Sequence, residues 1–399
     1  GGVYMNVKEY SVNELVPGMI IAAPVITNAG QILLDVGVTL TRPLIEKIAF
    51  YQIPSVTIEV VTGTEEKEPE KKEPEAKETA EKKADFFTQN SLLHYEQKTS
   101  TNGTSQAAEP SYSQKVKKSA AFQKFQVDFS FSANDLKNIF DSIVAGRAID
   151  TKDMLKKVTS LLKPEQTTID FFDMLHNLRS VNDSIYAHCI NVSLISRMIG
   201  IWLKLPQADI DTLTIAGLLH DIGKTQIPDD ILNKKERLTD EEFALIRKHP
   251  VFGYDILKKH DLDVRILKAT LMHHERCDGS GYPLALKEGD IDDFALIVAI
   301  ADVYDAMTAA RIYRAPLCPF EVIAEFEKEG LQKYKPKYIL TFLEHIATTY
   351  QNNRVMLSNG ESAKIVLLNQ QVFSKPLVQL TDGSCIDLNR SPLYIKAII

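Results

Sequence analysis

Cysteine is scarce in this sequence, tryptophan occurs once, and no long apolar run is present. The cysteines lack CxxC spacing and form no dense framework, which excludes a disulfide scaffold and is typical of a reducing compartment. They are Cys189, Cys277, Cys318 and Cys385. The most apolar window, FALIVAIADVY from Phe294, is too short to cross a bilayer and is interrupted by Asp302. Because the N-terminus also lacks a basic region followed by an apolar core, we expect a cytoplasmic protein without membrane insertion.

An excess of basic residues is missing as well. The formal net charge is -7, whereas domains that bind polymeric nucleic acid usually carry a positive excess that neutralises phosphates. We therefore expect no polymeric nucleic acid as a partner, while a small anionic ligand stays open if positive charge is concentrated locally. With 44% hydrophobic and 25% charged residues, the chain of 399 residues has the composition of a globular protein with two or three domains.

Apolar residues recur at helical spacing over residues 115–350, which predicts an all-helical domain. Residues 1–61 hold short β-branched runs broken by Pro-Gly and Asn-Ala-Gly, with one helical piece, RPLIEKIAFYQI. Residues 351–399 hold strand patterns around Asn-Gly and Asp-Gly turns. The predicted fold class is therefore mainly α: a helical bundle with a small β-rich N-terminal module and a small β C-terminal appendage.

Residues 62–114 have the composition of a linker. They begin with the charged, proline-interrupted run GTEEKEPEKKEPEAKETAEKKADFF and continue with the polar stretch QKTSTNGTSQAAEPS. Such a segment cannot bury enough apolar surface to offset the entropy lost on ordering it. We expect a flexible or partly helical connection between the N-terminal module and the helical domain.

Five of the nine histidines lie where a helical bundle could bring them together, and two aspartates accompany them. These residues are His188, His220, His249, His273, His274, Asp221 and Asp302. A single histidine on an apolar helix is more often a hydrogen-bonded core residue than a ligand. Imidazoles and carboxylates on facing helices, however, are how bundles build dinuclear metal centres, so the set as a whole predicts metal binding.

The segment GLLHDIGK is the strongest local signal. A buried carboxylate beside a buried imidazole is costly unless a cation neutralises it, and a metal ion does so. Asp221 can bridge two ions, and such a pair can hydrolyse a phosphoester by stabilising both oxygens of an in-line displacement. Lys224 is expected on the same helical face one turn later, where it either stabilises charge or protonates the leaving group, or is a surface lysine near a helix end.

The motifs LLHDIGK, KHPVFG, MHHERCDGSGYP and ADVYDAMTAARIYR together resemble the HD-GYP domain, a branch of the HD phosphohydrolases that cleaves cyclic di-GMP. The resemblance covers about residues 150–350. It implies that the five histidines, Asp221 and Asp302 are metal ligands, that Asp221 bridges the metals, and that Asp221 and Lys224 are the catalytic residues. It implies iron or manganese as the metals, although ligand type alone does not exclude zinc.

The loop that follows the histidine pair is expected to meet the substrate. Its glycines let the backbone approach a ligand closely, and Tyr282 can hydrogen-bond phosphate or stack on a base. The alternative is a glycine-rich turn without a ligand. The resemblance also assigns phosphate binding to Arg311 and Arg314, which otherwise read as solvated arginines. The expected substrate contacts are Asp183, Gly279, Gly281, Tyr282, Asp305, Arg311 and Arg314.

One position departs from the family pattern. Some members carry a glutamate one helical turn before the first histidine, where it helps to hold a third metal, but this chain has Ser184 there, next to Asp183. A hydroxyl is a poor substitute for a carboxylate, so we predict two metals and expect the linear dinucleotide pGpG, with GMP less favoured, as the product.

Three classes of function stay open at this point: a cyclic di-GMP phosphodiesterase, an HD hydrolase of another nucleotide, and a non-catalytic receptor for cyclic di-GMP. The complete ligand set and Lys224 favour catalysis. The helices between residues 115 and 165 either pair with a second chain in a homodimer or cap the bundle. The two terminal modules could sense a signal, tether the protein or bind a protein partner.

Overall fold

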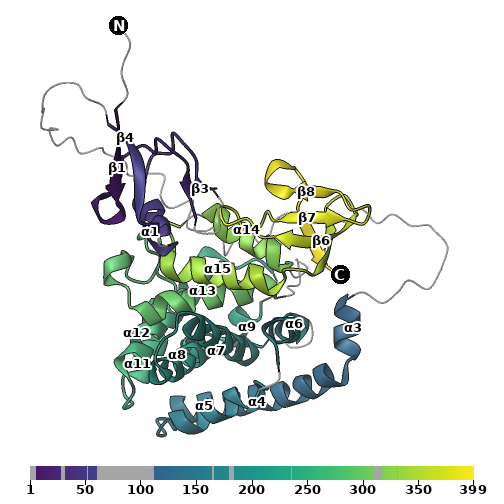
Figure 1. Ribbon diagram of the computed structural model, residues 1–399. Helices are drawn as coiled ribbons and strands as arrows, with labels where there is room; N and C mark the ends of the chain where they lie inside the picture. Colours follow the sequence, from purple (N-terminus) through teal and green to yellow (C-terminus); the bar gives the residue numbers. More distant parts are fainter. Residues whose placement is uncertain are drawn as a thin grey trace, which may run out of the picture.

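The computed structural model describes residues 6–27, 32–51, 53–60, 112–163, 166–178, 184–234, 236–309, 317–329 and 331–399. Helices fill the middle of the chain, between a small β module at the N-terminus and a five-stranded sheet at the C-terminus (Figure 1). This arrangement confirms the predicted mainly α fold with two small β parts. Residues 62–111 of the predicted linker lie outside the described residues, and a helix is already present at Tyr112.

The N-terminal module contains two two-stranded antiparallel sheets and one helix. Strand β1 (Asn6–Ser11) pairs antiparallel with β4 (Ser55–Val60), and β2 (Val25–Ile26) pairs antiparallel with β3 (Ile32–Leu34). Helix α1 (Arg42–Phe50) lies between them in sequence and has proline in its first turn, where a missing N–H costs nothing. The module has its own apolar core, which includes Ile21, Leu33, Leu40, Ile48 and Ile58.

The helical domain is built in layers. Its α-helices are α3 (Tyr112–Lys118), α4 (Ala120–Val144), α5 (Thr151–Thr159), α6 (Thr168–Leu178), α7 (Ile185–Trp202), α8 (Gln207–Leu219), α9 (Asp229–Leu232), α10 (Asp240–Ile246), α11 (His249–Leu257), α12 (Val264–Met272), α13 (Asp293–Thr308), α14 (Pro319–Glu329) and α15 (Pro336–Thr349). Figure 1 shows α4 and α5 along one outer side, the central helices α7, α8 and α13 above them, and α14 and α15 next to the two β parts.

The central helices are apolar on nearly every face because other helices surround them. Helix α13 reads DFALIVAIADVYDAMT, and almost all of its side chains are buried. It starts where Asp292 accepts a hydrogen bond from the backbone N–H of Phe294 at 3.0 Å. The two buried aspartates of this helix, Asp302 and Asp305, are therefore charges that need partners.

The C-terminal sheet has the order β8-β7-β6-β5-β9, and every neighbouring pair is antiparallel. Its strands are β5 (Arg354–Leu357), β6 (Ser362–Leu367), β7 (Leu377–Leu380), β8 (Cys385–Asp387) and β9 (Ile395–Ile398). Strand β5 alternates between exposed and buried residues, so Val355 and Leu357 point into the core that it shares with the helical domain.

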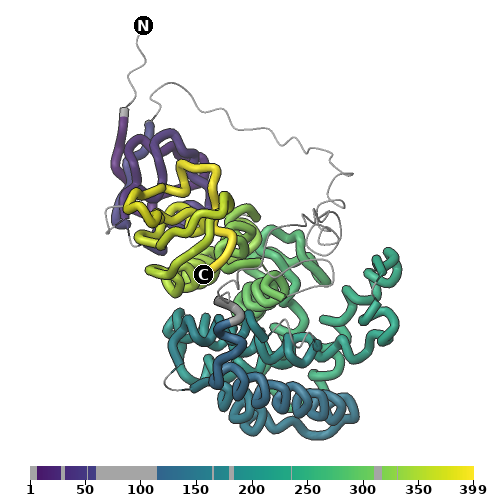
Figure 2. The backbone as a smooth tube through the Cα atoms, turned by 90° about the vertical axis from the view of Figure 1, so that its right-hand side faces the viewer, coloured from purple at the N-terminus to yellow at the C-terminus, as the bar shows by residue number. Residues whose placement is uncertain are grey.

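Both β parts lie on the same side of the helical domain, next to α14 and α15, as Figures 1 and 2 show from two directions. Lys47 of α1 is buried and donates a hydrogen bond to the backbone carbonyl of Gln371, at 3.3 Å. Ser374 donates to the carboxylate of Glu327 in α14 at 2.5 Å. These contacts join the N-terminal module, the helical domain and the C-terminal sheet.

None of the helices in the described ranges combines the length and the apolar content needed to span a bilayer.

Candidate metal centre

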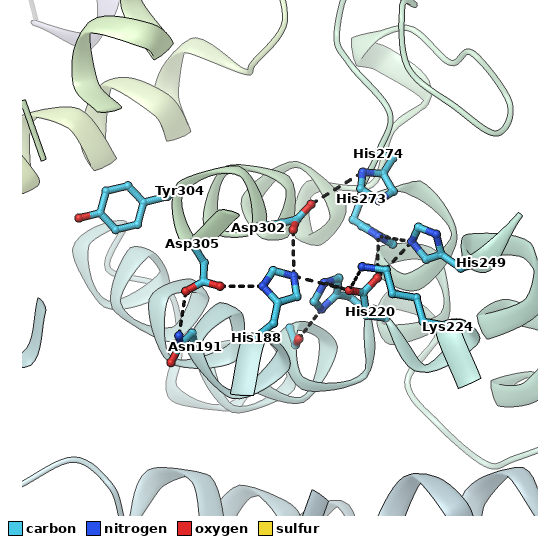
Figure 3. Close-up of polar contacts among 12 residues, drawn as sticks. His188, Asn191, His220, Lys224, His249, His273, His274, Asp302, Tyr304 and Asp305 are labelled. Atoms are coloured by element: carbon cyan, nitrogen blue, oxygen red, sulfur yellow. Dashed lines mark hydrogen bonds and ion pairs between the residues drawn. The ribbon is translucent and has the colours of Figure 1, made fainter. Parts of the chain in front are cut away.

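The seven residues predicted as metal ligands come together at one place between α7, α8, α12 and α13 (Figure 3). Their ligand atoms form two groups within which all atoms lie within 4.8 Å of one another. One group is Asp221, His249, His273 and His274, and the other is His188, His220 and Asp302. Each group contains several imidazoles and one carboxylate, which is a donor set suited to a transition metal. The cluster could therefore bind two metal ions.

Three of the histidines follow helix ends and use them in the same way. His220 comes directly after α8, and its Nδ1 donates to the carbonyl of Gly217 at 2.7 Å. His249 follows the last turn of α10 and donates to the carbonyl of Ile246 at 2.8 Å. His273 follows α12 in the same way.

The Nδ1 of His273 donates to the carbonyl of Thr270 at 2.9 Å. The last carbonyls of a helix lack intrahelical donors, and a carbonyl can only accept. The proton of each neutral imidazole is therefore fixed on Nδ1. The lone pair on Nε2 of all three histidines is left for a metal.

His188 is oriented by a carboxylate instead of a helix end. Its Nδ1 lies 2.7 Å from Oδ2 of Asp305, and the other oxygen of Asp305 accepts a hydrogen bond from Asn191 at 2.8 Å. Asp305 is 1% exposed. The Nε2 of His188 then lies 3.1 Å from Oδ1 of Asp302 and 3.5 Å from Oδ2 of Asp221. Asp305 thus aims the imidazole at the centre of the cluster.

Asp221 lies between the two groups of imidazoles and turns one oxygen toward each. Its Oδ1 is 3.1 Å from Nε2 of His249 and 3.8 Å from Nε2 of His273. Its Oδ2 is 3.3 Å from Nε2 of His220 and 3.5 Å from Nε2 of His188. This position is the one that a bridging carboxylate requires.

Several atoms of the cluster lack the partners that burial demands. Nε2 of His220 is buried and has no hydrogen-bond partner among the described residues. The Nε2 atoms of His249 and His273 lie 3.2 Å apart, although Nδ1 already holds the proton in both rings. Two lone pairs that face each other in a buried site are unfavourable unless a cation lies between them. The residues present therefore fit metal ions.

The electrostatics of the imidazoles support the same conclusion. Burial lowers the pKa of His249 and holds the pKa values of His273 and His274 well below their usual range, so all three stay neutral. Burial also lowers the pKa of His188, but hydrogen bonds to Asp302 and Asp305 outweigh it and raise this pKa to about 9. His188 thus carries a proton that a bound metal would displace.

The sequence around His220 and Asp221 does not form one continuous α-helix, which corrects the predicted position of Lys224. Helix α8 ends at Leu219, and a 3₁₀ turn covers Ile222–Gln226. The reason is close packing: a Cβ on Gly223 would lie 1.9 Å from the carbonyl oxygen of His249. Lys224 still forms an ion pair with Oδ2 of Asp221, because residues three apart eclipse in a 3₁₀ turn.

The pKa values of this ion pair reflect the mutual attraction of its members. Burial would raise the pKa of Asp221, but the nearby ammonium of Lys224 holds it well below its usual range. Burial would likewise lower the pKa of Lys224, but Asp221 and Asp302 raise it. Asp221 is therefore ionised and Lys224 protonated, next to the cluster.

The loop after the histidine pair is held against the cluster by Glu275. This carboxylate is 1% exposed and accepts hydrogen bonds from the backbone N–H groups of Leu284, at 2.7 Å, and Leu286, at 2.9 Å. A Cβ on Gly281 would lie 2.4 Å from Cα of Glu275. The ring of Tyr282 stacks on His274, with centroids 4.6 Å apart and planes at 23°. The loop therefore forms one wall beside the cluster.

Comparison with known proteins identifies the family. The family model described as HD domain matches residues 148–338. The chain is 36% identical over 248 residues to cyclic di-GMP phosphodiesterase PA4108 of Pseudomonas aeruginosa, which covers 61% of this chain and 59% of that protein. It is 36% identical over 204 residues to a cyclic di-GMP phosphodiesterase of Thermotoga maritima, covering 48% of this chain and 55% of the relative. Residues 148–338 thus match the HD domain, and the motifs around the cluster resemble those of its HD-GYP branch.

A third relative is the 3'3'-cGAMP-specific phosphodiesterase 2 of Vibrio cholerae, which is 36% identical over 161 residues. That match covers 40% of this chain and 31% of the relative. The chain thus spans between about a third and three fifths of the length of these curated relatives. The similarity concerns the HD-GYP domain more than the β parts, since the family model begins at residue 148 and ends at residue 338.

Of the predicted substrate contacts, some lie beside the metal centre and others do not. Tyr282 is beside the cluster, as expected, but its ring already contacts His274 and the guanidinium of Arg247. Asp305 was expected to contact the substrate, but its carboxylate lies buried behind His188 instead. The reason is that Asp305 follows Asp302 by one helical turn and points toward α7.

The glycines serve the conformation of the loop itself. Gly279 has φ +83°, in the left-handed region that favours glycine, and Gly281 packs against the backbone of residues 274–276. Asp183, Arg311 and Arg314 lie outside the described residues. Helix α13 ends at Thr308, and Ala309 is extended with ψ 140°.

Ser184 has a local role at the start of α7. Its Oγ accepts a hydrogen bond from the backbone N–H of Ala187 at 3.2 Å, which caps the helix that carries His188. The residue that departs from the family pattern is thus a helix cap in this chain.

Three residues of the HD-GYP site were missed by reasoning from the sequence: Asn191, Glu275 and Arg247. Asn191 is one helical turn after His188, and Glu275 comes directly after the histidine pair, so their spacing from ligands was an available signal. Arg247 gave no such signal because its contact, Tyr282, is distant in sequence.

Proposed function

We propose that the HD-GYP domain is a metal-dependent phosphodiesterase that hydrolyses cyclic di-GMP to the linear dinucleotide pGpG. The observation that carries the proposal is the position of Asp221, with one oxygen toward each of two groups of imidazoles and carboxylates. The names of the relatives from Pseudomonas and Thermotoga support cyclic di-GMP as the substrate.

The proposed cofactor is a pair of iron or manganese ions. One ion would be held by His249, His273 and His274, the other by His188, His220 and Asp302, and Asp221 would bridge them. Imidazole-rich ligation suits these metals better than magnesium or calcium, which prefer oxygen ligands. When bound, the metals would polarise the scissile phosphate and favour an ionised attacking water.

The side chains of this protein would then stabilise charge, transfer a proton and position the ligands during the reaction. A water oxygen bonds to phosphorus while the bond from phosphorus to the ribose 3'-oxygen breaks. Lys224 is protonated and lies beside Asp221, so it can stabilise the developing negative charge or give a proton to the departing oxygen. Asp305 and Asn191 hold His188 in place, and Glu275 holds the loop that carries Tyr282.

The remaining substrate contacts are part of the proposal as well. Tyr282 would bind through its hydroxyl, and Gly279 and Gly281 would shape the loop backbone around the dinucleotide. Asp183, Arg311 and Arg314 would add polar and phosphate contacts from residues outside the described ranges. With Ser184 in place of a glutamate, two metals and a first cleavage to pGpG are proposed in preference to three metals and GMP.

An anaerobic assay tests the proposal directly. Protein is purified without chelator, its metal content is measured, and it is incubated with cyclic di-GMP while the products are separated over time. We expect about two metals per chain and accumulation of pGpG. Asp221→Ala should lose metal and turnover together, whereas Lys224→Met should keep the metal and lose turnover by about a hundredfold.

The competing functions predict other results in the same assay. A receptor would bind cyclic di-GMP without cleaving it, while loaded with metal. An HD hydrolase of another nucleotide would leave cyclic di-GMP intact and cleave a different compound; 3'3'-cGAMP is included because the Vibrio relative is named for it. Full turnover by the Asp221→Ala variant would contradict the proposed mechanism.

For the whole protein we propose a cytoplasmic location. We also propose a homodimer formed through the outer helices α4 and α5. The dimer is proposed because α4 carries exposed apolar side chains: Phe131 is 72% and Val127 is 54% exposed. A protein partner could dock on the N-terminal module or on the C-terminal sheet. Sedimentation of the full chain with and without Phe131→Lys tests the dimer.

A further inference from the structure

Arg247 covers the ring of Tyr282 at the edge of the metal centre. It lies at the end of α10, two residues before His249, and its Cζ is 4.5 Å from the centroid of the Tyr282 ring. The Tyr282 ring itself stacks on His274. A guanidinium, a phenol and an imidazole of the metal centre thus form one connected stack that joins α10 to the loop.

The guanidinium of Arg247 is not neutralised by the part of the chain that the structure describes. No hydrogen bond or ion pair of its side chain is formed there, and the residue is only partly buried. Other arginines of the domain differ: Arg265 pairs with Asp209 and Asp263. Arg276 next to the loop donates to the backbone carbonyl of Glu275 at 2.8 Å. Arg247 therefore keeps donors for a ligand.

The Tyr282 ring covers one side of the guanidinium, and no residue of the described ranges accepts a hydrogen bond from its N–H groups. An arginine held by an aromatic face loses little conformational freedom when it binds, and its edge matches two oxygens of a phosphate. Because the charge has no carboxylate partner within the described ranges, the ligand that suits it is an anion. The anion would lie next to Tyr282, whose ring stacks on His274 of the metal centre.

We propose that Arg247 binds an oxygen of the second phosphodiester of the substrate, the one that is not cleaved. The inference rests on the proposed function, in which the metal ligands take the scissile phosphodiester of a cyclic dinucleotide. The ring of such a substrate contains a second phosphodiester with its own negative charge. Arg247 supplies a cation for it from α10, independent of any contribution from Arg311 and Arg314.

Steady-state kinetics of metal-loaded protein test this inference. Arg247→Ala should raise KM for cyclic di-GMP and Kd for pGpG by about tenfold to a hundredfold, the loss of one charged hydrogen-bonded contact. The metal content should stay at the wild-type value, and kcat should change less than threefold. Arg247→Lys should recover only part of the loss, since an ammonium neither stacks nor binds two oxygens.

Lys248→Ala is the matched control. Lys248 carries the same charge one residue further on, is exposed, and forms no side-chain hydrogen bond, ion pair or ring contact within the described ranges. It should leave KM near the wild-type value. An equal rise of KM in both variants would overturn the inference. It would mean that any nearby positive charge attracts the substrate, without a specific contact from Arg247.

Substrate comparison separates phosphate binding from base recognition. If Arg247 holds a phosphodiester, Arg247→Ala should weaken binding of cyclic di-GMP, 3'3'-cGAMP and cyclic di-AMP by the same factor. A loss confined to compounds with guanine would overturn the phosphate assignment. In a Tyr282→Leu background, Arg247→Ala should weaken binding less than it does in the wild type, because the aromatic ring that covers the guanidinium is absent.

The two proposals fail in different ways. If the metal-loaded wild type cleaves cyclic di-GMP and Arg247→Ala has the same KM, only the role of Arg247 is overturned. If the wild type binds cyclic di-GMP without cleaving it, the phosphodiesterase proposal fails, and the ratio of Kd values for wild type and Arg247→Ala decides the role of Arg247. Absence of both binding and cleavage contradicts both.

Discussion

The carboxylate of Asp305 lies directly behind His188, with Oδ2 2.7 Å from Nδ1 of the imidazole. Its other oxygen accepts from Asn191, which follows His188 by one helical turn. Two residues of α13 and two residues of α7 thus form one network of polar contacts. In this network Asp302 faces the metal centre, and Asp305 holds His188 from behind. An outer carboxylate of this kind fixes the orientation of a ligand histidine and raises its basicity.

Replacing Asp305 by alanine should weaken metal binding at the group of His188, His220 and Asp302 by about tenfold to a hundredfold. The other group should retain its metal, so the stoichiometry should fall from two toward one. Metal titration followed by calorimetry measures both affinities. Asp293→Ala, which removes an exposed carboxylate from the same helix, serves as the control. Loss of both metals, or of neither, would contradict the positioning role.

The metal-free protein should become less stable as the pH rises from about 6.5 to about 9. In the folded chain, Asp302 and Asp305 outweigh the effect of burial and raise the pKa of His188 from 6.5 to about 9. The folded state therefore binds this proton more tightly than the unfolded state does. The stabilisation is complete below pH 6.5 and disappears as the pH passes 9; it amounts to about 3 kcal/mol at most.

Urea unfolding in chelator at several pH values measures this change in the free energy of unfolding. His188→Gln should remove most of the decline. The metal-loaded protein should lack it too, because a bound metal keeps the imidazole deprotonated. The lowered pKa values of His249 and His273 do not add to it, since these residues are neutral in both states above pH 6.5. A decline of the same size in His188→Gln would refute the assignment.

Gly281→Ala should displace the loop that carries Tyr282. The added Cβ would meet Cα of Glu275 at 2.4 Å and the backbone N of Arg276 at 2.5 Å, and backbone atoms cannot rotate away. We expect a loss of about 1–3 kcal/mol in the free energy of unfolding. Turnover should fall at least tenfold while metal remains bound. Gly289→Ala is the control, because a Cβ there meets nothing within 4 Å.

Ser184→Glu should raise the metal content toward three and shift the product from pGpG toward GMP. The substitution also removes the cap of α7, which costs about 1 kcal/mol. Ser184→Ala isolates that cost without adding a carboxylate, and Ser184→Asp keeps a capping oxygen. Elemental analysis and separation of the products over time decide the question. Unchanged metal content and unchanged products in Ser184→Glu would remove the significance of this departure from the family pattern.

Much of the metal centre could be predicted from the sequence because its ligands belong to short, distinctive motifs. The histidines, Asp221 and Asp302 were expected together, and the structure brings them together. The surroundings were predicted less well. Asp305 was expected to contact the substrate but is buried, and Lys224 was expected on an α-helix that in fact ends before it. In both cases packing against another helix, which no local pattern encodes, decides the position.

The sequence by itself determined the kinds of atoms available to the site: the imidazoles and carboxylates, their order along the chain, and the helical periods that place them in a core. Tertiary structure alone decided how they divide into two groups and which oxygen of Asp221 faces each. It also placed Arg247 over Tyr282. The physical reason is that a contact between distant segments depends on how helices end and cross, whereas side-chain chemistry is fixed residue by residue.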